Sequence, residues 1–394
     1  MTQRRFEGGM VVLGGELRPA DVTTIDGRIA AVDTDSSGTS GSSGTPGSSG
    51  TADVIDCAGL IVAPGYIDLQ CNGAGGFDLT SGVVDGPDVI GHVAEALPRF
   101  GVTSFLPTVV TSPRGVRDAA REALRLARPG APGSAMPLGL HFEGPMISRD
   151  HLGAHAHELA TSLDDDEIDE WIADDTVSLV TLSPEFGGAV EVVRRLSASG
   201  VVVSAGHTGA SPSEFDMARR SGLSYVTHLF NAMAPFDHRN PGPIGAVLAD
   251  PTVTAGLICD GIHVDPVTVR MAWRALGPSR LSLVSDAAAP LGAPFGTFDL
   301  GRREVRHDTS GVRTIDGTLA GSALALDQAV RNLVDFTDCS FVDAIATVTT
   351  TPADLLGLTD RGRITTDARA DLTILTPDGQ LVATVIGGDI AWKS

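Results

Sequence analysis

A chain of 394 residues, 42% of them hydrophobic, is long enough to bury the core of a large barrel together with a smaller unit. The formal net charge of −21 argues against nucleic acid and anionic membranes as partners, and no apolar run approaches the about 20 residues of a membrane span. Four widely spaced cysteines without a CxxC pair, and a beginning without an apolar signal segment, predict a reducing, cytoplasmic setting.

The first part of the chain, residues 1–63, predicts short strands joined by glycine turns. Residues 35–53 form a Gly/Ser/Thr-rich run with nothing to bury, which predicts a flexible surface loop without a functional role. Strand and turn signals return near the C-terminus. We therefore expect residues 1–63 and 360–394 to pair into one small β-sandwich domain.

The middle of the chain, residues 64–359, alternates apolar runs of strand length with stretches of helix length. Strands are expected over 66–69, 102–110, 137–144, 176–184, 201–206, 224–227, 252–259 and 281–285, and helices over 113–127, 189–199, 211–222 and 266–276. About eight buried strands with helical crossovers are typical of a parallel (β/α)₈ barrel of the TIM type.

Polar residues cluster at the predicted strand ends, where such barrels carry their active sites. They are Gln70, Asn72, Glu143, His207, His228, Asp260, His263 and Asp286. A glutamate and two histidines suit Zn²⁺ or a similar divalent ion, and three protein ligands leave an open position for water. Asp286 faces the same rim and is expected to take a proton from that water.

Single histidines in a barrel are more often hydrogen-bonding core residues than ligands. His141, two positions before Glu143, imitates an HxE ligand pair, and we interpret it as a supporting or core residue. His151, His155 and His157 lie in one loop, where all three are compatible with simple solvation. The argument for a metal therefore rests on the convergence of several strand ends.

Several motifs together carry a resemblance to a known family. They are APGYIDLQCNGAGG, HFEGPMIS, SAGHTGA, VTHLFNAMAPFDHRNPGPIGA, ICDGIHVDP, LVSDAAAP and GTLAGSALALDQAVRNLV. In these motifs the chain resembles the N-acetylglucosamine-6-phosphate deacetylases of the amidohydrolase superfamily, from about residue 9 to the C-terminus except the run 35–53. The stretch THLFNAM followed by PGPIGA is the most specific part.

This resemblance implies a role for each matching residue. The metal ligands are Glu143, His207 and His228, and Asp286 is the catalytic acid and base. His155 polarises the acetyl carbonyl, and the substrate-binding residues are His155, Asn231, Ala232, Arg239, His263 and Leu319. Arg239 suits phosphate because its planar fork matches the phosphate oxygens. The resemblance also implies a homodimer in which His263 reaches the neighbouring subunit's site.

Gln70 and Asn72 stand where the superfamily carries an HxH pair that holds a second metal. Neutral amides are poor zinc ligands but good hydrogen-bonding groups, so they suit a vacant second site or a bound water. Cys71 between them is expected to point into the packing. We therefore predict one divalent ion per subunit, most simply Zn²⁺.

The leading interpretation is metal-dependent hydrolysis of N-acetyl-D-glucosamine 6-phosphate to D-glucosamine 6-phosphate and acetate. An alternative substrate is another N-acetyl amino sugar phosphate, such as N-acetylgalactosamine 6-phosphate, because nothing in the sequence reads the C4 hydroxyl. A third interpretation, an inactive barrel serving as a binding protein, is motivated by the missing HxH pair. It predicts further losses among the ligands, and Glu143, His207, His228 and Asp286 are all present.

Overall fold

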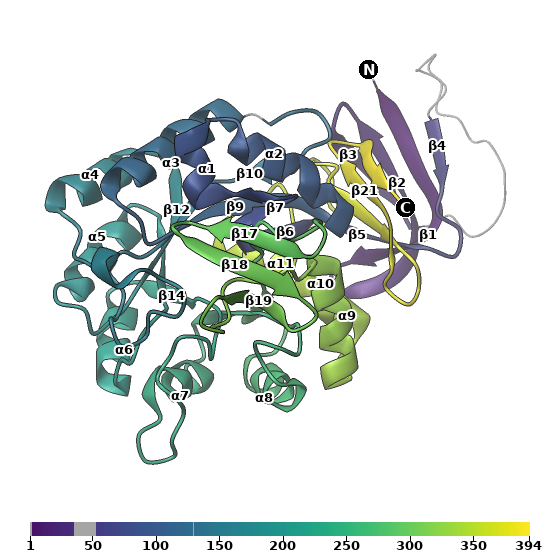
Figure 1. The fold of residues 1–394 in the computed structure, drawn as a ribbon. Coiled ribbons are helices and arrows are strands. Elements are labelled where there is room, and N and C mark those ends of the chain that lie inside the picture. Colours follow the sequence, from purple (N-terminus) through teal and green to yellow (C-terminus); the bar gives the residue numbers. More distant parts are fainter. Residues whose placement is uncertain (1, 35–52, 129) are drawn as a thin grey trace.

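A computed structural model describes residues 2–34, 53–128 and 130–394 of the chain. The predicted flexible loop, residues 35–53, lies outside these ranges apart from Asp53, the first residue of a strand. The described part contains a parallel barrel and, beside it, a sheet made from both ends of the chain (Figure 1).

The barrel consists of eight parallel strands. They are β6 (Tyr66–Cys71), β9 (Val102–Val110), β11 (Leu140–Glu143), β12 (Val177–Leu182), β13 (Val202–Ala205), β14 (Leu223–Val226), β15 (Thr254–Leu257) and β16 (Leu281–Leu283). A parallel bridge between Cys71 and Ala287 brings the first strand beside the last one. Most strand positions are buried on both faces, which explains why these strands are rich in apolar residues without a strict alternation of apolar and polar positions. The predicted barrel is confirmed.

Helices connect the barrel strands and surround them (Figure 1). They are α1 (Leu79–Asp85), α2 (Val89–Ala96), α3 (Arg114–Ala127), α4 (Asp165–Ala173), α5 (Ala189–Ala198), α6 (Pro212–Arg220), α7 (Gly242–Ala249), α8 (Pro266–Leu276), α9 (Leu326–Thr337), α10 (Phe341–Ala346) and α11 (Thr350–Leu355), with 3-10 turns η1 (Leu97–Phe100) and η2 (His157–Leu159). Four of them match the predicted helices within two residues at either end. Ser211 and Glu214 form a reciprocal capping box that starts α6, and Asp265 caps α8.

The second sheet joins the two ends of the chain. Its strand order is β22 (Asp389–Lys393), β21 (Leu381–Ile386), β20 (Leu372–Leu375), β5 (Ile61–Pro64), β1 (Gln3–Leu13), β2 (Glu16–Ile25) and β3 (Arg28–Asp33), with β4 (Asp53–Asp56) also paired to β1. The strands form one continuous hydrogen-bonded sheet, and residues from both ends of the chain share a buried cluster that includes Phe6, Val22, Val62, Leu372 and Val385. The predicted pairing of the two ends is therefore confirmed.

A three-stranded antiparallel sheet was not predicted. It comprises β17 (Gly296–Leu300), β18 (Arg303–Asp308) and β19 (Gly311–Thr314), and it lies across the front of the barrel in Figure 1. Two small pairings complete the structure: β7 (Gly73–Ala74) with β8 (Phe77–Asp78), and β10 (Met136–Pro137) with β9. The three-stranded sheet follows the last barrel strand directly, which places it over the strand ends where the polar residues gather.

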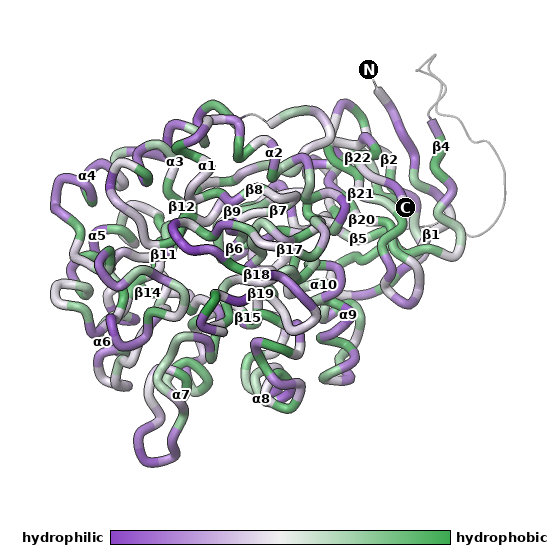
Figure 2. Tube along the Cα trace, viewed as in Figure 1, coloured by the Kyte–Doolittle hydropathy of each residue, from purple (hydrophilic) through white to green (hydrophobic). Residues whose placement is uncertain are grey.

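Hydrophobic residues concentrate inside the barrel, whereas the outer turns of the helices and the loop before α7 are mostly hydrophilic (Figure 2). The largest buried cluster contains Phe105, Phe142, Trp171 and Tyr225, contributed by strands and helices around the whole barrel. Across residues 2–34, 53–128 and 130–394, no helix combines the length and apolar character needed to cross a membrane.

Candidate metal centre and active site

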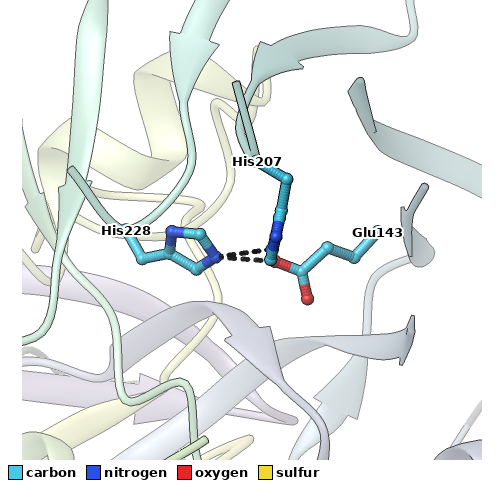
Figure 3. Close-up of side chains that lie close together, drawn as sticks. All are labelled: Glu143, His207 and His228. Carbon is cyan, nitrogen blue, oxygen red and sulfur yellow. Dashed lines mark hydrogen bonds and ion pairs between the residues drawn. The ribbon is translucent and has the colours of Figure 1, made fainter. Parts of the chain in front are cut away.

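Glu143, His207 and His228 bring three ligand atoms together at the strand ends, and Figure 3 shows them pointing toward one another. Oε1 of Glu143 lies 3.2 Å from Nε2 of His207 and 2.9 Å from Nε2 of His228, and the two histidine nitrogens are 3.1 Å apart. Within the part of the chain that the structure describes, this is the one group of three or more such side chains with metal-ligand spacing.

This geometry fits a divalent cation better than it fits a hydrogen-bonded cluster. Ligands about 2.0–2.1 Å from a tetrahedral zinc ion are about 3.3 Å from each other, which is close to the separations found here. Nδ1 of His207 is used on the carbonyl of His151, so the neutral ring has no proton on Nε2 for the Glu143 oxygen 3.2 Å away. All three side chains are buried, so a cation would be shielded from bulk water.

The backbone directs two of these ligands, and Asp286, out of their strands. His207, His228 and Asp286 all have positive φ angles, of 50°, 33° and 48° respectively. Non-glycine residues rarely adopt this left-handed conformation, which costs on the order of 1 kcal/mol each and is characteristic of functional sites. All three residues lie two or three positions beyond the ends of β13, β14 and β16.

Surrounding groups orient the histidine rings. Nδ1 of His207 donates to the backbone carbonyl of His151 at 3.0 Å, which leaves Nε2 free to face Glu143. Nδ1 of His155 lies 2.7 Å from Oγ1 of Thr111, and its Nε2 lies 3.7 Å from Oε2 of Glu143. The carbonyl of His151 and the hydroxyl of Thr111 carry no recognisable sequence signature, and sequence analysis did not find either role.

Asp286 is hydrogen-bonded to the side-chain amides of Gln70 and Asn72 beside the ligand cluster. Its Oδ1 accepts hydrogen bonds from Nε2 of Gln70 at 2.9 Å and from Nδ2 of Asn72 at 2.7 Å. Nε2 of Gln70 also donates to Glu143 at 3.2 Å and so bridges the two carboxylates. The amides therefore act as donors to carboxylates. Cys71 is fully buried in the main core cluster, as predicted.

Burial and neighbouring charge divide the two carboxylates into different roles. Burial opposes ionisation of Glu143, but His155, His207 and His228 hold the pKa of this carboxyl well below its usual range. Burial, with repulsion from Glu143, raises the pKa of Asp286 to about 7. Burial, with the charge of His155, lowers the pKa of His207 to about 4, so its ring is neutral and able to ligate. An ionised glutamate and a neutral imidazole suit ligands, whereas a carboxyl near neutrality suits proton transfer.

A cavity of about 210 Å³ connects these groups to the surface. Among its lining residues are six of the predicted substrate or catalytic residues: His155, Asn231, Ala232, His263, Asp286 and Leu319. Leu300, Thr318 and Leu319, from the three-stranded sheet and the loop after it, form its outer wall. The structure thus brings most of the predicted site together, and the roles of the individual residues stay predictions.

Arg239 and His263, both predicted to bind the phosphate, differ in their position relative to the cavity. Arg239 is exposed in the loop before α7 and does not line the cavity; its backbone N–H donates to Asp237. His263 lines its own chain's cavity, where its Nδ1 lies 2.7 Å from Oδ2 of Asp260. That His263 reaches the site of a neighbouring subunit stays a prediction. In this structure its ring lines the cavity of its own chain.

His141 is a core residue rather than a ligand. Its Nδ1 lies 3.2 Å from Oγ1 of Thr108 and its Nε2 lies 2.7 Å from Oγ1 of Thr181, and the ring is fully buried. Burial lowers its pKa to about 4, so the ring is neutral. The interpretation of His141 as a supporting residue agrees with this arrangement.

A profile of the amidohydrolase family matches residues 61–391, most of the chain. The chain belongs to the amidohydrolase family. It is 40% identical over 350 residues to a protein of Bos taurus named N-acetylglucosamine-6-phosphate deacetylase, covering 86% of this chain and 85% of that protein. A protein of Bacillus subtilis with the same name is 34% identical over 341 residues, or 85% of each chain.

Solved structures agree with this assignment. N-acetylglucosamine-6-phosphate deacetylase from Pasteurella multocida superposes over all of both chains with a TM-score of 0.90 at 26% identity. A mutant of the enzyme from Mycobacterium smegmatis, in complex with N-acetyl-D-glucosamine-6-phosphate, superposes over 99% of this chain and 100% of that chain, with a TM-score of 0.87 at 29% identity. These comparisons confirm the family resemblance seen in the sequence motifs.

Proposed function

We propose that this protein hydrolyses the N-acetyl group of N-acetyl-D-glucosamine 6-phosphate, giving D-glucosamine 6-phosphate and acetate. The observation that carries the proposal is the position of Asp286, which faces the Glu143, His207 and His228 cluster across one cavity. The names of the relatives at 34% to 40% identity supply the substrate class.

Each residue of the site has a task in this reaction. A divalent cation held by Glu143, His207 and His228, most simply one Zn²⁺ per chain, would lower the pKa of water and polarise the amide carbonyl. Asp286 accepts the proton of the attacking water and returns it to the sugar nitrogen as the C–N bond breaks. His155 donates a hydrogen bond to the developing oxyanion, held in place by Thr111.

The sugar phosphate extends from this centre toward Asn231, Ala232 and His263. Arg239 is exposed and does not line the same cavity. The proposal therefore includes a second copy of the chain whose Arg239 completes the phosphate site. We also propose that the protein forms a homodimer, and its cytoplasmic setting stays a prediction from the sequence.

The test is acetate release by purified protein together with its metal content. N-acetylglucosamine 6-phosphate is compared with N-acetylgalactosamine 6-phosphate and with unphosphorylated N-acetylglucosamine. We expect fastest turnover of the first substrate by protein that carries a divalent metal. Faster turnover of N-acetylgalactosamine 6-phosphate would show that this epimer, and not N-acetylglucosamine 6-phosphate, is the preferred substrate. Metal-loaded protein that releases no acetate from any of the three compounds would refute the proposal.

A further inference from the structure

A second cavity, of about 300 Å³, lies beside the active-site cavity. It occupies the space between α1, the start of α3, the loop after Gly153 and the turn between β17 and β18. Apolar side chains such as Val84, Val116 and Leu159 provide most of its lining, and Asp85, Arg302 and Arg303 also border it. The deacetylation proposed above makes no use of it.

The two cavities share four lining residues, Val110, Ala154, His155 and Leu300. Leu300 is 6% exposed and belongs to a small buried cluster against which Val110 and Ala154 pack. The backbone next to Leu300 comes close to Val110, since a Cβ added at Gly301 would lie 3.2 Å from Cγ2 of Val110. These shared residues therefore form a thin wall between the cavities, which we call the dividing wall.

The dividing wall stands at the acyl end of the active site. The sugar phosphate extends toward Asn231, Ala232 and His263, and the scissile carbonyl lies between the ligand cluster and His155 in the proposed reaction. His155 belongs to the wall, so the acyl substituent on that carbonyl lies next to Val110, Ala154 and Leu300. An apolar surface at this point suits a methyl group.

We propose that Val110 and Leu300 set the length of the acyl group that this enzyme removes, and that the second cavity is a space for longer acyl chains from which the dividing wall separates the active site. This inference rests on the proposed deacetylase function. In the wild type, the side chain of Leu300 blocks any acyl group that extends beyond the acetyl methyl. When the Leu300 side chain is shortened, the two cavities join, and a linear apolar chain extends from the carbonyl into the space beside Val116 and Leu159.

The experiment compares N-acetyl- and N-butanoyl-glucosamine 6-phosphate as substrates of the wild type and of Leu300→Ala. One methylene more or less in an apolar pocket changes kcat/KM by about 10- to 200-fold. We expect the wild type to prefer the acetyl substrate by at least about tenfold, and Leu300→Ala to shift the ratio toward the butanoyl substrate by at least about tenfold.

Val312→Ala is the matched control. Val312 belongs to the same small buried cluster as Leu300 but lines neither cavity, so its truncation loosens the packing without opening the wall. Its acyl preference is expected to equal that of the wild type. Val110→Ala opens the wall from the barrel side and serves as the second test where Leu300→Ala does not fold.

The outcomes separate the two proposals. Wild-type protein that releases acetate, combined with an unchanged acyl preference in folded, metal-loaded Leu300→Ala and Val110→Ala, overturns the inference and leaves the deacetylase function intact. The same shift in Val312→Ala also overturns it, because general loosening then explains the result. Wild-type protein that hydrolyses neither substrate refutes the deacetylase function itself.

Discussion

Replacing Asp286 with asparagine removes the proposed proton acceptor while keeping the shape of the site. Oδ1 of Asp286 accepts from Gln70 and Asn72 at 2.9 and 2.7 Å, and the amide oxygen of an asparagine accepts the same two bonds. Gln70 also donates to the predicted ligand Glu143 at 3.2 Å, and the substitution leaves both of these side chains in place. We therefore expect Asp286→Asn to fold and to keep the metal content of the wild type.

The expected loss of activity follows from the two proton transfers assigned to one carboxylate. A positioned acid or base contributes about 10²- to 10⁴-fold to a rate, and a group that serves in both directions belongs near the upper limit. We expect kcat for acetate release to fall by about 10³- to 10⁴-fold in Asp286→Asn, with the metal content unchanged.

The pH dependence gives a second readout. Burial and the charge of Glu143 raise the pKa of Asp286 to about 7. A base must be ionised to act, so kcat/KM of the wild type falls as pH drops below this pKa. A cation at the neighbouring ligands favours the ionised form and moves this decline below pH 7. Asp286→Asn is expected to lack the decline. Turnover within about tenfold of the wild type, or an unchanged acidic decline, would refute the assignment.

Three further predictions concern the metal, the phosphate and the core. Elemental analysis of protein purified without chelators is expected to find one divalent ion per chain and none in His228→Ala; a second fully occupied ion beside Gln70 and Asn72 would contradict this. Arg239→Ala is expected to raise KM for the phosphorylated sugar far more than for the unphosphorylated sugar. Equal increases of KM for both sugars would contradict the assignment of Arg239 to phosphate binding. Burial raises the pKa of Asp68 to about 6 despite its hydrogen bonds with Ser285, so its ionisation weakens the fold at neutral pH and this cost disappears as pH falls. Relative to wild type, Asp68→Asn should gain about 1.4 kcal/mol more stability at pH 8 than at pH 5. Chemical denaturation at both pH values measures this, with the exposed Asp175→Asn as control, and a pH-independent difference would contradict it.

Much of the barrel and its site was predictable because parallel strands leave a strong signal. Their residues are buried on both faces, so β9 and β12 appear as mainly apolar runs interrupted only by serine and threonine among their polar residues. The strand-end rule then places Glu143, His207, His228 and Asp286 on one rim, and the structure brings these four residues together around one cavity. Helix α8 was also predictable to the residue, because Asp265 and Pro266 mark its start and Gly277 follows its end.

The remaining features leave weaker signals. Strands β17 to β19 are short, and most of their residues are not fully buried, so they lack the apolar pattern of the barrel strands. Helix α7 contains two glycines and a proline in eight residues, which hides it from propensity arguments. His151 accepts the hydrogen bond of His207 through its backbone carbonyl, which every residue type has, so the sequence does not mark this position. The distance of Arg239 from the cavity depends on the path of one loop, which no local pattern records.

Because of the position of β5, the sheet that contains both ends of the chain can be completed only when both ends are present. This strand pairs with β1 on one side and with β20 on the other, so the last 23 residues complete a sheet that the first residues begin. During synthesis the edge of β5 remains open until β20 leaves the ribosome, after the whole barrel has been made. Loss of the final strands would therefore destabilise the whole sheet, from β22 to β3, rather than one end of the molecule.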